Sequence, residues 1–178
     1  MPPRIPTQAV CVTLAALLAL AGCGPKADEY APACPVLRML GDGADLVRFN
    51  GRGQDITDLT LQARISGVQA ACAAGARGIV RATIKPVFDV LRGPALAGRE
   101  AQMRYFVAVV EGDTVRDEQD FAANVAFAPN ADRVQASGEE ITMHLPVTTE
   151  KNAARFTIYV SFRLTPQELA YNRRTRTN

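Results

Sequence analysis

The chain has 178 residues, with 20 basic and 18 acidic side chains, a single histidine and no tryptophan. A formal net charge of +2 gives no general attraction to nucleic acid, so we expect no nucleic-acid partner. Histidine is the most common general base in enzymes, and the sequence also lacks a nucleophile elbow, a phosphate-binding loop and a zinc-protease motif. Hydrolases and transferases are therefore disfavoured.

An apolar stretch from Ala9 to Ala21 follows a short start whose only charge is Arg4. This is the layout of a removable signal peptide, and the stretch is shorter than the roughly 20 apolar residues of a membrane span. It ends in the run Leu20-Ala21-Gly22-Cys23. This run resembles the lipobox of bacterial lipoproteins, a leucine, two small residues and a cysteine, at all four positions.

In that family the cysteine thiol receives a diacylglyceryl group, the signal peptide is cut before it, and the new amino terminus is usually acylated. The resemblance therefore implies that residues 1–22 are removed and that Cys23 becomes a lasting anchor, since several acyl chains hold a protein stably in a bilayer. Gly24 stands where an aspartate often retains lipoproteins at the inner membrane, so we expect the periplasmic face of the outer membrane. The alternative is an ordinary secreted protein that is cut elsewhere and keeps Cys23 as a plain thiol.

Residues 23–35 contain two interior prolines and little apolar mass, which indicates a tether. Of the four cysteines, Cys11 leaves with the signal peptide and Cys23 carries lipid, so Cys34 and Cys72 remain as a pair in an oxidising compartment. We predict a disulfide between them, which contributes about 4 kcal/mol on the chain-entropy model. A metal or redox pair is the alternative, but the spacing is not that of a CxxC motif and no histidine lies nearby.

The pattern that follows has a period of two, which is typical of half-buried strands. Between Leu59 and Cys72 apolar and polar residues alternate, and the parity changes at Gly67, which predicts a bulge. The next strand is expected over residues 79–91. Pro86 interrupts it and has no N–H for a ladder, so we expect this strand to lie at an edge or to carry a bulge there.

Residues 103–110 are almost all apolar, which predicts a central strand covered on both faces. A turn at residues 111–114 then indicates a hairpin, and residues 141–147 and 156–164 give the cleanest alternation. About seven strands without a long helical pattern predict an all-β fold, an antiparallel sandwich of immunoglobulin-like kind over residues 36–164. The absence of tryptophan argues against a true immunoglobulin domain.

Residues 165–178 are expected to form a short helix and a basic tail. The run from Thr165 to Glu168 is a capping box with proline at the first helical position. The helix is then expected to fray into Arg173, Arg174 and Arg176. This tail is a candidate contact for anionic lipid or an envelope polymer, and the alternative is a solvated, frayed end.

The tethered start, the Cys34-Pro35 pair, the paired strands and the run from Leu164 to Asn172 together resemble uncharacterised envelope lipoproteins of proteobacteria. This second resemblance implies a plausible fold and carries no activity or site residue.

His144 alternates with the apolar residues of its strand, so we interpret it as a surface histidine rather than a catalytic or metal-binding one. An acidic cluster near the predicted hairpin matches no calcium loop and is interpreted as charge that keeps an exposed edge soluble. Its members are Glu111, Asp113, Asp117, Glu118 and Asp120. The outward Arg64, Arg81 and Lys85 form either a basic face or an ordinary solvated one. We predict neither a metal nor a cofactor.

Three functions follow from these observations, and the first is preferred. It is a non-enzymatic, lipid-anchored periplasmic domain that binds another envelope protein in assembly, scaffolding or maintenance, for example by strand addition at an edge near Pro86. The second is a module that binds a small apolar ligand or a glycan in a cavity between the sheets. The third is an enzyme with two carboxylates about 5 to 10 Å apart. A bare edge or an apolar patch favours the first, a lined cavity the second and paired buried carboxylates the third.

Overall fold

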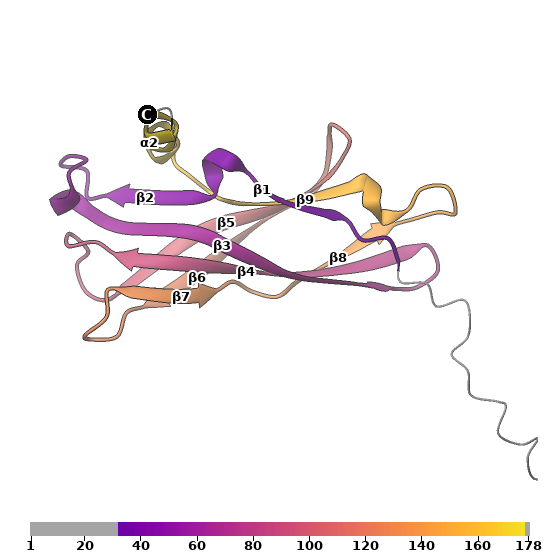
Figure 1. Ribbon diagram of the computed structural model, residues 1–178, viewed down its shortest axis with the longest axis horizontal. Helices are drawn as coiled ribbons and strands as arrows, with labels where there is room; N and C mark the ends of the chain where they lie inside the picture. Colours follow the sequence, from indigo (N-terminus) through magenta and orange to yellow (C-terminus); the bar gives the residue numbers. More distant parts are fainter. Residues whose placement is uncertain (1–31, 177–178) are drawn as a thin grey trace, which may run out of the picture. The chain divides into compact units, whose positions relative to one another are not determined.

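The computed structural model describes residues 32–176, which form two sheets and one helix (Figure 1). Sheet A contains, in spatial order, β1 (Val36–Met39), β9 (Phe156–Phe162), β5 (Glu100–Glu111) and β6 (Thr114–Ala126). Sheet B contains β2 (Asp45–Phe49), β3 (Leu59–Ala74), β4 (Ile79–Arg92) and β7 (Arg133–Ser137), and β8 (Ile141–Pro146) also pairs with β4. The helix α2 spans Pro166–Arg176.

All of these strand pairs are antiparallel except β1 with β9, which is parallel. The described chain is therefore mostly β, with two antiparallel-rich sheets in a sandwich-like arrangement and a short C-terminal helix, as the sequence predicts at this level. The structure has nine strands in residues 32–176, compared with the expected number of about seven. Two short strands without a clear apolar alternation, β1 and β7, account for the difference.

The core lies between the sheets because every second residue of the long strands points inward. Three aromatic residues meet at its centre: the ring of Phe88 lies 5.2 Å from that of Tyr105 and 5.5 Å from that of Phe162. The Tyr105 hydroxyl accepts a hydrogen bond from the Glu139 N–H at 3.1 Å, which satisfies the one polar atom of this cluster. Burial raises the pKa of Tyr105, although the hydrogen bond from Glu139 acts in the opposite direction.

The predicted bulge in β3 is confirmed. The pairing of β3 with β4 shifts register between Ile65 and Gly67, where the apolar parity of the sequence changes. Ser66, the extra residue, donates its hydroxyl to the carbonyl of Val87 at 3.3 Å. The bulge lets one long strand keep its apolar side chains on a single face.

The strand that contains Pro86 is expected from the sequence to lie at an edge or to carry a bulge there. The first alternative is wrong, because β4 is a central strand of sheet B, and the register shift next to Pro86 lies in the partner strand β3. The strand β4 pairs with β3 on one side and, on the other side, with β8 up to Ile84 and with β7 from Val87 onward. Pro86 therefore lies where β4 changes its partner from β8 to β7. Its missing N–H removes no bond from the β4–β8 ladder or from the β4–β7 ladder. Its carbonyl still accepts a hydrogen bond from the Gly138 N–H at 2.9 Å.

The central strand and the hairpin of sheet A are confirmed. β5 lies between β9 and β6, and its residues Val107, Ala108 and Val109 are buried in succession. The β5–β6 hairpin turns at Gly112, whose φ of 59° lies in the left-handed region that glycine adopts without strain.

Candidate functional site

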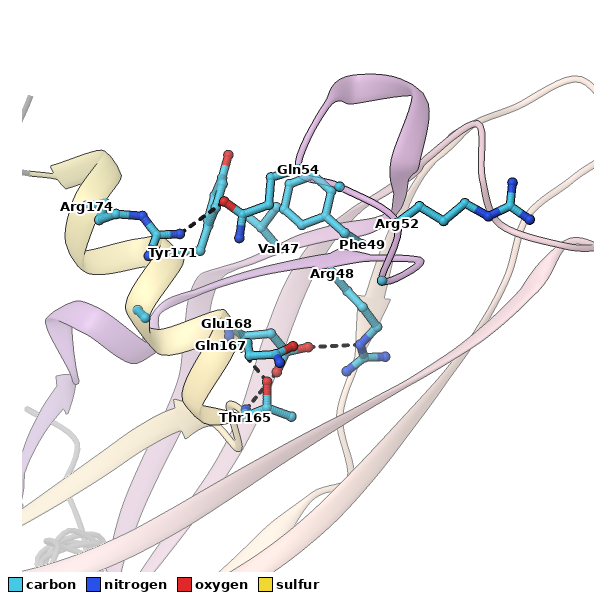
Figure 2. A pocket seen from close by; sticks show the side chains of 13 residues that line it. Val47, Arg48, Phe49, Arg52, Gln54, Thr165, Gln167, Glu168, Tyr171 and Arg174 are labelled. Carbon is cyan, nitrogen blue, oxygen red and sulfur yellow. Dashed lines mark hydrogen bonds and ion pairs between the residues drawn. The ribbon is translucent and has the colours of Figure 1, made fainter.

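The helix α2 and the strand β2 of sheet B border an open groove of about 600 Å³, which we call the α2 groove (Figure 2). One wall is α2, and the other is the end of β2 with the loop that follows it, residues 47–54. Figure 1 shows α2 beside β2, at the end of the sandwich opposite the turn between β3 and β4.

The capping box fixes where α2 begins, as predicted. The Thr165 N–H donates to Oε2 of Glu168 at 2.8 Å, and the Glu168 N–H donates to Oγ1 of Thr165 at 3.2 Å. These reciprocal bonds satisfy two of the backbone donors that a helix start leaves without partners.

Glu168 also fastens the helix to both sheets. Its other oxygen, Oε1, lies 2.9 Å from Nε of Arg48 on β2. Arg48 in turn donates through Nη1 to the carbonyl of Gln102 on β5, at 3.1 Å. Because Glu168 is buried, this hydrogen-bonded ion pair is what makes its charge tolerable.

A second buried polar side chain of α2 holds the turn between β1 and β2. The Asn172 amide nitrogen donates to the carbonyls of Asp42 and Asp45 at 2.8 and 2.7 Å. Sequence reasoning missed both Arg48 and Asn172 because each is an isolated polar residue. No spacing in the sequence connects either residue to its distant partners.

Aromatic and basic side chains from both walls line the α2 groove. The rings of Phe49 and Tyr171 meet edge to face, with centroids 5.2 Å apart. Arg174 donates to Oε1 of Gln54 at 3.0 Å across the groove. Figure 2 shows Arg52 extending away from α2, and within the described residues its guanidinium has no hydrogen-bond or ion-pair partner.

The expectation that the chain frays at the basic tail is corrected by the structure, because α2 continues through Arg176. Arg173 and Arg176 lie beside Asp42, with nitrogen to oxygen distances of 3.0 and 3.4 Å. The hydrogen bond from Arg173, with a further contribution from Arg176, lowers the pKa of Asp42 below its ordinary value. The three arginines thus divide between Asp42 and the α2 groove. Their contact with anionic lipid or polymer stays a prediction.

Two polar side chains that line the α2 groove are already used to hold the helix. The groove's one carboxylate, Glu168, is already held by Arg48, and its one hydroxyl from a threonine, that of Thr165, caps the helix. Within residues 32–176, no group of three or more His, Cys, Asp or Glu side chains is arranged to hold a metal ion.

The predicted disulfide between Cys34 and Cys72 is present, with the two Cα atoms 5.9 Å apart. It fastens the residues before β1 to the far end of β3. Cys23 and the rest of the lipobox lie outside the described residues, as do the signal peptide and most of the tether.

The strand β1, which begins two residues after Cys34, is an edge of sheet A. One side of it pairs with β9, and no described strand pairs with the other side. Three large apolar residues in and just after β1 are exposed: Val36 by 41 %, Met39 by 46 % and Leu40 by 39 %. An open backbone edge and an apolar surface thus coincide here.

His144 is exposed on the outer face of β8, as predicted, and pairs in register with Arg81. It borders a second groove of about 630 Å³ between the β5–β6 hairpin and β8, which we call the β6–β8 groove. Apolar side chains that include Val109, Met143 and Phe156 line part of this groove.

The acidic cluster is divided among separate ion pairs. Glu111 lies 2.8 Å from Arg116 and 3.3 Å from Arg155, on the rim of the β6–β8 groove. Glu118 and Asp120 both lie 2.6 Å from Arg163 on the outer face of sheet A. The hydrogen bond with Glu118 is the main reason that the pKa of Arg163 is raised. Three of the five carboxylates are thus paired with arginines, and Asp117 accepts a hydrogen bond from Gln119 at 2.9 Å.

The outward cations of sheet B are not one group either. Arg64 lies 2.6 Å from Asp45, and this hydrogen bond raises the pKa of the guanidinium. Arg81 and Lys85 lie farther along the sheet and have no ion-pair partner among the described residues.

No protein-family model, curated protein or solved structure matches this chain. Among the described residues, no helix has both the length and the apolar character needed to cross a membrane.

Proposed function

We propose that this protein is a lipid-anchored, non-enzymatic domain of the periplasm that binds another envelope protein along the open edge of β1, in an assembly, scaffolding or maintenance role. The observation that carries the proposal is the coincidence at β1 of an unpaired strand edge with the exposed Val36, Met39 and Leu40. Natural sheet edges are usually protected by charge, proline or a covering segment.

The partner that fits this edge is an extended segment of another protein, which would add a strand to sheet A. The main-chain groups of β1 would supply the affinity, and the apolar side chains would supply pockets for alternate residues of the partner. The mode is the one expected from the sequence, but the place is β1, because the strand that contains Pro86 is central.

The anchor is the second part of the proposal. The four matched positions of the lipobox support lipid on Cys23, and Gly24 supports the periplasmic face of the outer membrane. The membrane would then be contacted through the lipid, which keeps β1 close to other envelope proteins.

An immunoglobulin-like topology also belongs to this proposal. It is supported by two facing sheets whose connections repeatedly pass from one sheet to the other, as in the chain order β1, β2 and β4, β5.

The β6–β8 groove favours the alternative function, binding of a small apolar ligand or a glycan. Its volume of about 630 Å³ is that of an ordinary ligand pocket, and apolar residues line part of it. A ligand there would be expected to shift the NMR signals of His144, which borders this groove and is the one histidine of the chain, whereas a partner on β1 would leave them unchanged.

The test of the partner proposal is photo-crosslinking in cells, with the photoreactive residue placed at Val36 or at Arg38. We expect capture of one envelope protein, with the crosslinked residue of that protein moving by two positions when the probe moves by two. With the probe at Arg38, Val36→Lys together with Met39→Lys should abolish the capture. The matched control, Ile56→Lys with Val115→Lys, changes two apolar side chains that are 76 % and 56 % exposed away from β1 and should leave it intact.

Capture that does not follow the strand register, or that survives the lysines on β1, would contradict the proposal. Loss of capture in the control variant as well would show that the partner recognises another surface.

A further inference from the structure

We propose that the outer face of sheet B near Cys72 lies against the anionic phospholipid headgroups of the membrane that holds the anchor. The contact residues are Arg77, Arg81 and Lys85, which we call the β4 basic strip. This inference rests on the proposed lipidation of Cys23, and it adds an orientation of the domain on the bilayer that the anchor alone does not give.

The register of sheet B places Arg81 and Lys85 of the strip on one face. Arg81 pairs with Ala73 of β3 and with His144 of β8, and Lys85 pairs with Gln69 of β3. Paired residues project from the same side of a sheet, and residues four apart on one strand also share a side, about 13 Å apart. Arg77 is exposed in the turn that leads into β4.

The outward positions of this half of the sheet carry no carboxylate. In the three paired strands they are Gln69, Ala71, Ala73, Arg81, Thr83, Lys85, Thr142 and His144. Glu140, just before β8, is the nearest acidic residue along that strand and forms no ion pair with Lys85. Glu111 and Asp117 of the β5–β6 hairpin share the β6–β8 groove with Thr142 and His144, at the border of this face. Glu111 is paired there with Arg116 and Arg155, and none of the three residues of the strip lines that groove. The face therefore presents cations whose charge is available to an external anion.

The tether leads to the same place. Cys34, at its end, is bonded to Cys72, and the next residue of β3, Ala73, pairs with Arg81. Cys34 lies eleven positions after Cys23, so the fully extended chain between them reaches about 40 Å. The anchor therefore confines the strip within reach of the headgroups, at a high effective concentration.

Each lysine or arginine close to an anionic leaflet strengthens membrane association about fivefold, so three of them give about a hundredfold preference for this orientation at low salt. The preference falls as salt rises, because the contact is electrostatic and screened over about a Debye length.

The experiment uses the full chain, expressed in a bacterium, purified with its anchor and reconstituted in vesicles. Mass spectrometry first establishes lipid on Cys23. Because the chain has no tryptophan, Ala71→Trp puts the only indole on the proposed contact face, and Gln62→Trp puts it on the same face at the other end of β3. Energy transfer to a dansyl headgroup is then measured in phosphatidylcholine vesicles with and without phosphatidylglycerol.

We expect phosphatidylglycerol to increase transfer from A71W much more than from Q62W, and salt to reverse the increase. Arg81→Glu with Lys85→Glu should remove it. Arg52→Glu with Arg133→Glu changes the net charge equally at two exposed arginines outside the strip, and should preserve it.

Equal transfer from the two tryptophans in lipidated protein, or an increase that survives R81E with K85E, would overturn the orientation and leave the anchor standing. Absence of lipid on Cys23 would overturn the anchor, and the orientation with it.

Discussion

The two ends of the segment that contains β1 and β2 are held in different ways. At the α2 end, a helix fastens it through many polar contacts, among them Arg48 with Glu168 and Asn172 with two carbonyls. At the other end, a single disulfide between Cys34 and Cys72 fastens the segment to β3. The arginines of α2 contact Asp42 or Gln54, whereas Arg81, beside the disulfide, has no ion-pair partner among the described residues. A cation without an ion-pair partner in the protein is a better indicator of a binding surface than one that is already paired.

We expect removal of the disulfide between Cys34 and Cys72 to have the largest effect on stability. Cys34→Ser should lower the free energy of unfolding of the oxidised protein by about 4 kcal/mol, because the bond closes a loop with a sequence separation of 38 residues in the unfolded chain. Chemical denaturation with and without reductant measures this. Cys72→Ser and the double variant should give the same loss, and a midpoint that does not respond to reductant would show that the bond does not stabilise the domain.

Loss of the Asn172 hydrogen bonds at the α2 end should lower the free energy of unfolding about half as much. Asn172→Ala leaves the carbonyls of Asp42 and Asp45 without their donor, and should lower the free energy of unfolding by about 2 kcal/mol. Urea denaturation provides the measurement, with Asn130→Ala, at an exposed turn position, as the matched control. Equal effects of the two changes would mean that the α2 end is held by something other than Asn172.

A substitution at Tyr105 tests the contribution of the core to stability, apart from the disulfide and from the contacts of α2. Tyr105→Phe loses the hydrogen bond to Glu139 and should cost about 1 kcal/mol at neutral pH. The raised pKa of Tyr105 gives a second signature. The buried neutral phenol stabilises the fold fully below the ordinary value of 10.0, and this stability is lost as the pH rises through the higher folded value. The alkaline decline in thermal midpoint should thus be shallower in Y105F than in the parent or in Tyr159→Phe, and parallel declines would contradict this assignment.

The smallest effect is expected at the end of α2. Arg173→Ala removes an exposed contact with Asp42 and should shift the thermal midpoint only slightly at neutral pH. Because the pKa of Asp42 is lowered, the contact stabilises the fold above the ordinary value of 3.8 and is lost as the pH falls through the lower folded value. The midpoints of R173A and the parent should converge in acid, and a difference that persists there would show that Arg173 acts through another contact.

The sequence predicts what depends on local pattern. The parity change at Gly67, the turn before Thr114 and the reciprocal bonds of Thr165 with Glu168 all involve neighbours in the chain, and all are found in the structure. The disulfide could also be predicted, because the expected loss of Cys11 and the expected lipidation of Cys23 leave two cysteines to pair.

What could not be predicted depends on neighbours that are distant in sequence. Pro86 indicates a missing ladder bond, but only the arrangement of β7 and β8 shows that the gap lies between two partners of a central strand. Arg48 and Glu168 are similarly remote from each other, so their ion pair leaves no trace in residue spacing. The exposed edge of β1 became visible only when its single partner, β9, was known.

The parallel pairing of β1 with β9 joins the first described strand to the last one, and this sets an order of events in time. As the chain emerges from the ribosome or from a membrane pore, β3 and β4 can pair early, and Cys34 can already meet Cys72. Val36 cannot find Thr157 until almost the whole chain is present. Contacts between residues so far apart are associated with slow folding. The β1–β9 pair of sheet A can therefore form only after residues 157–160 have become available.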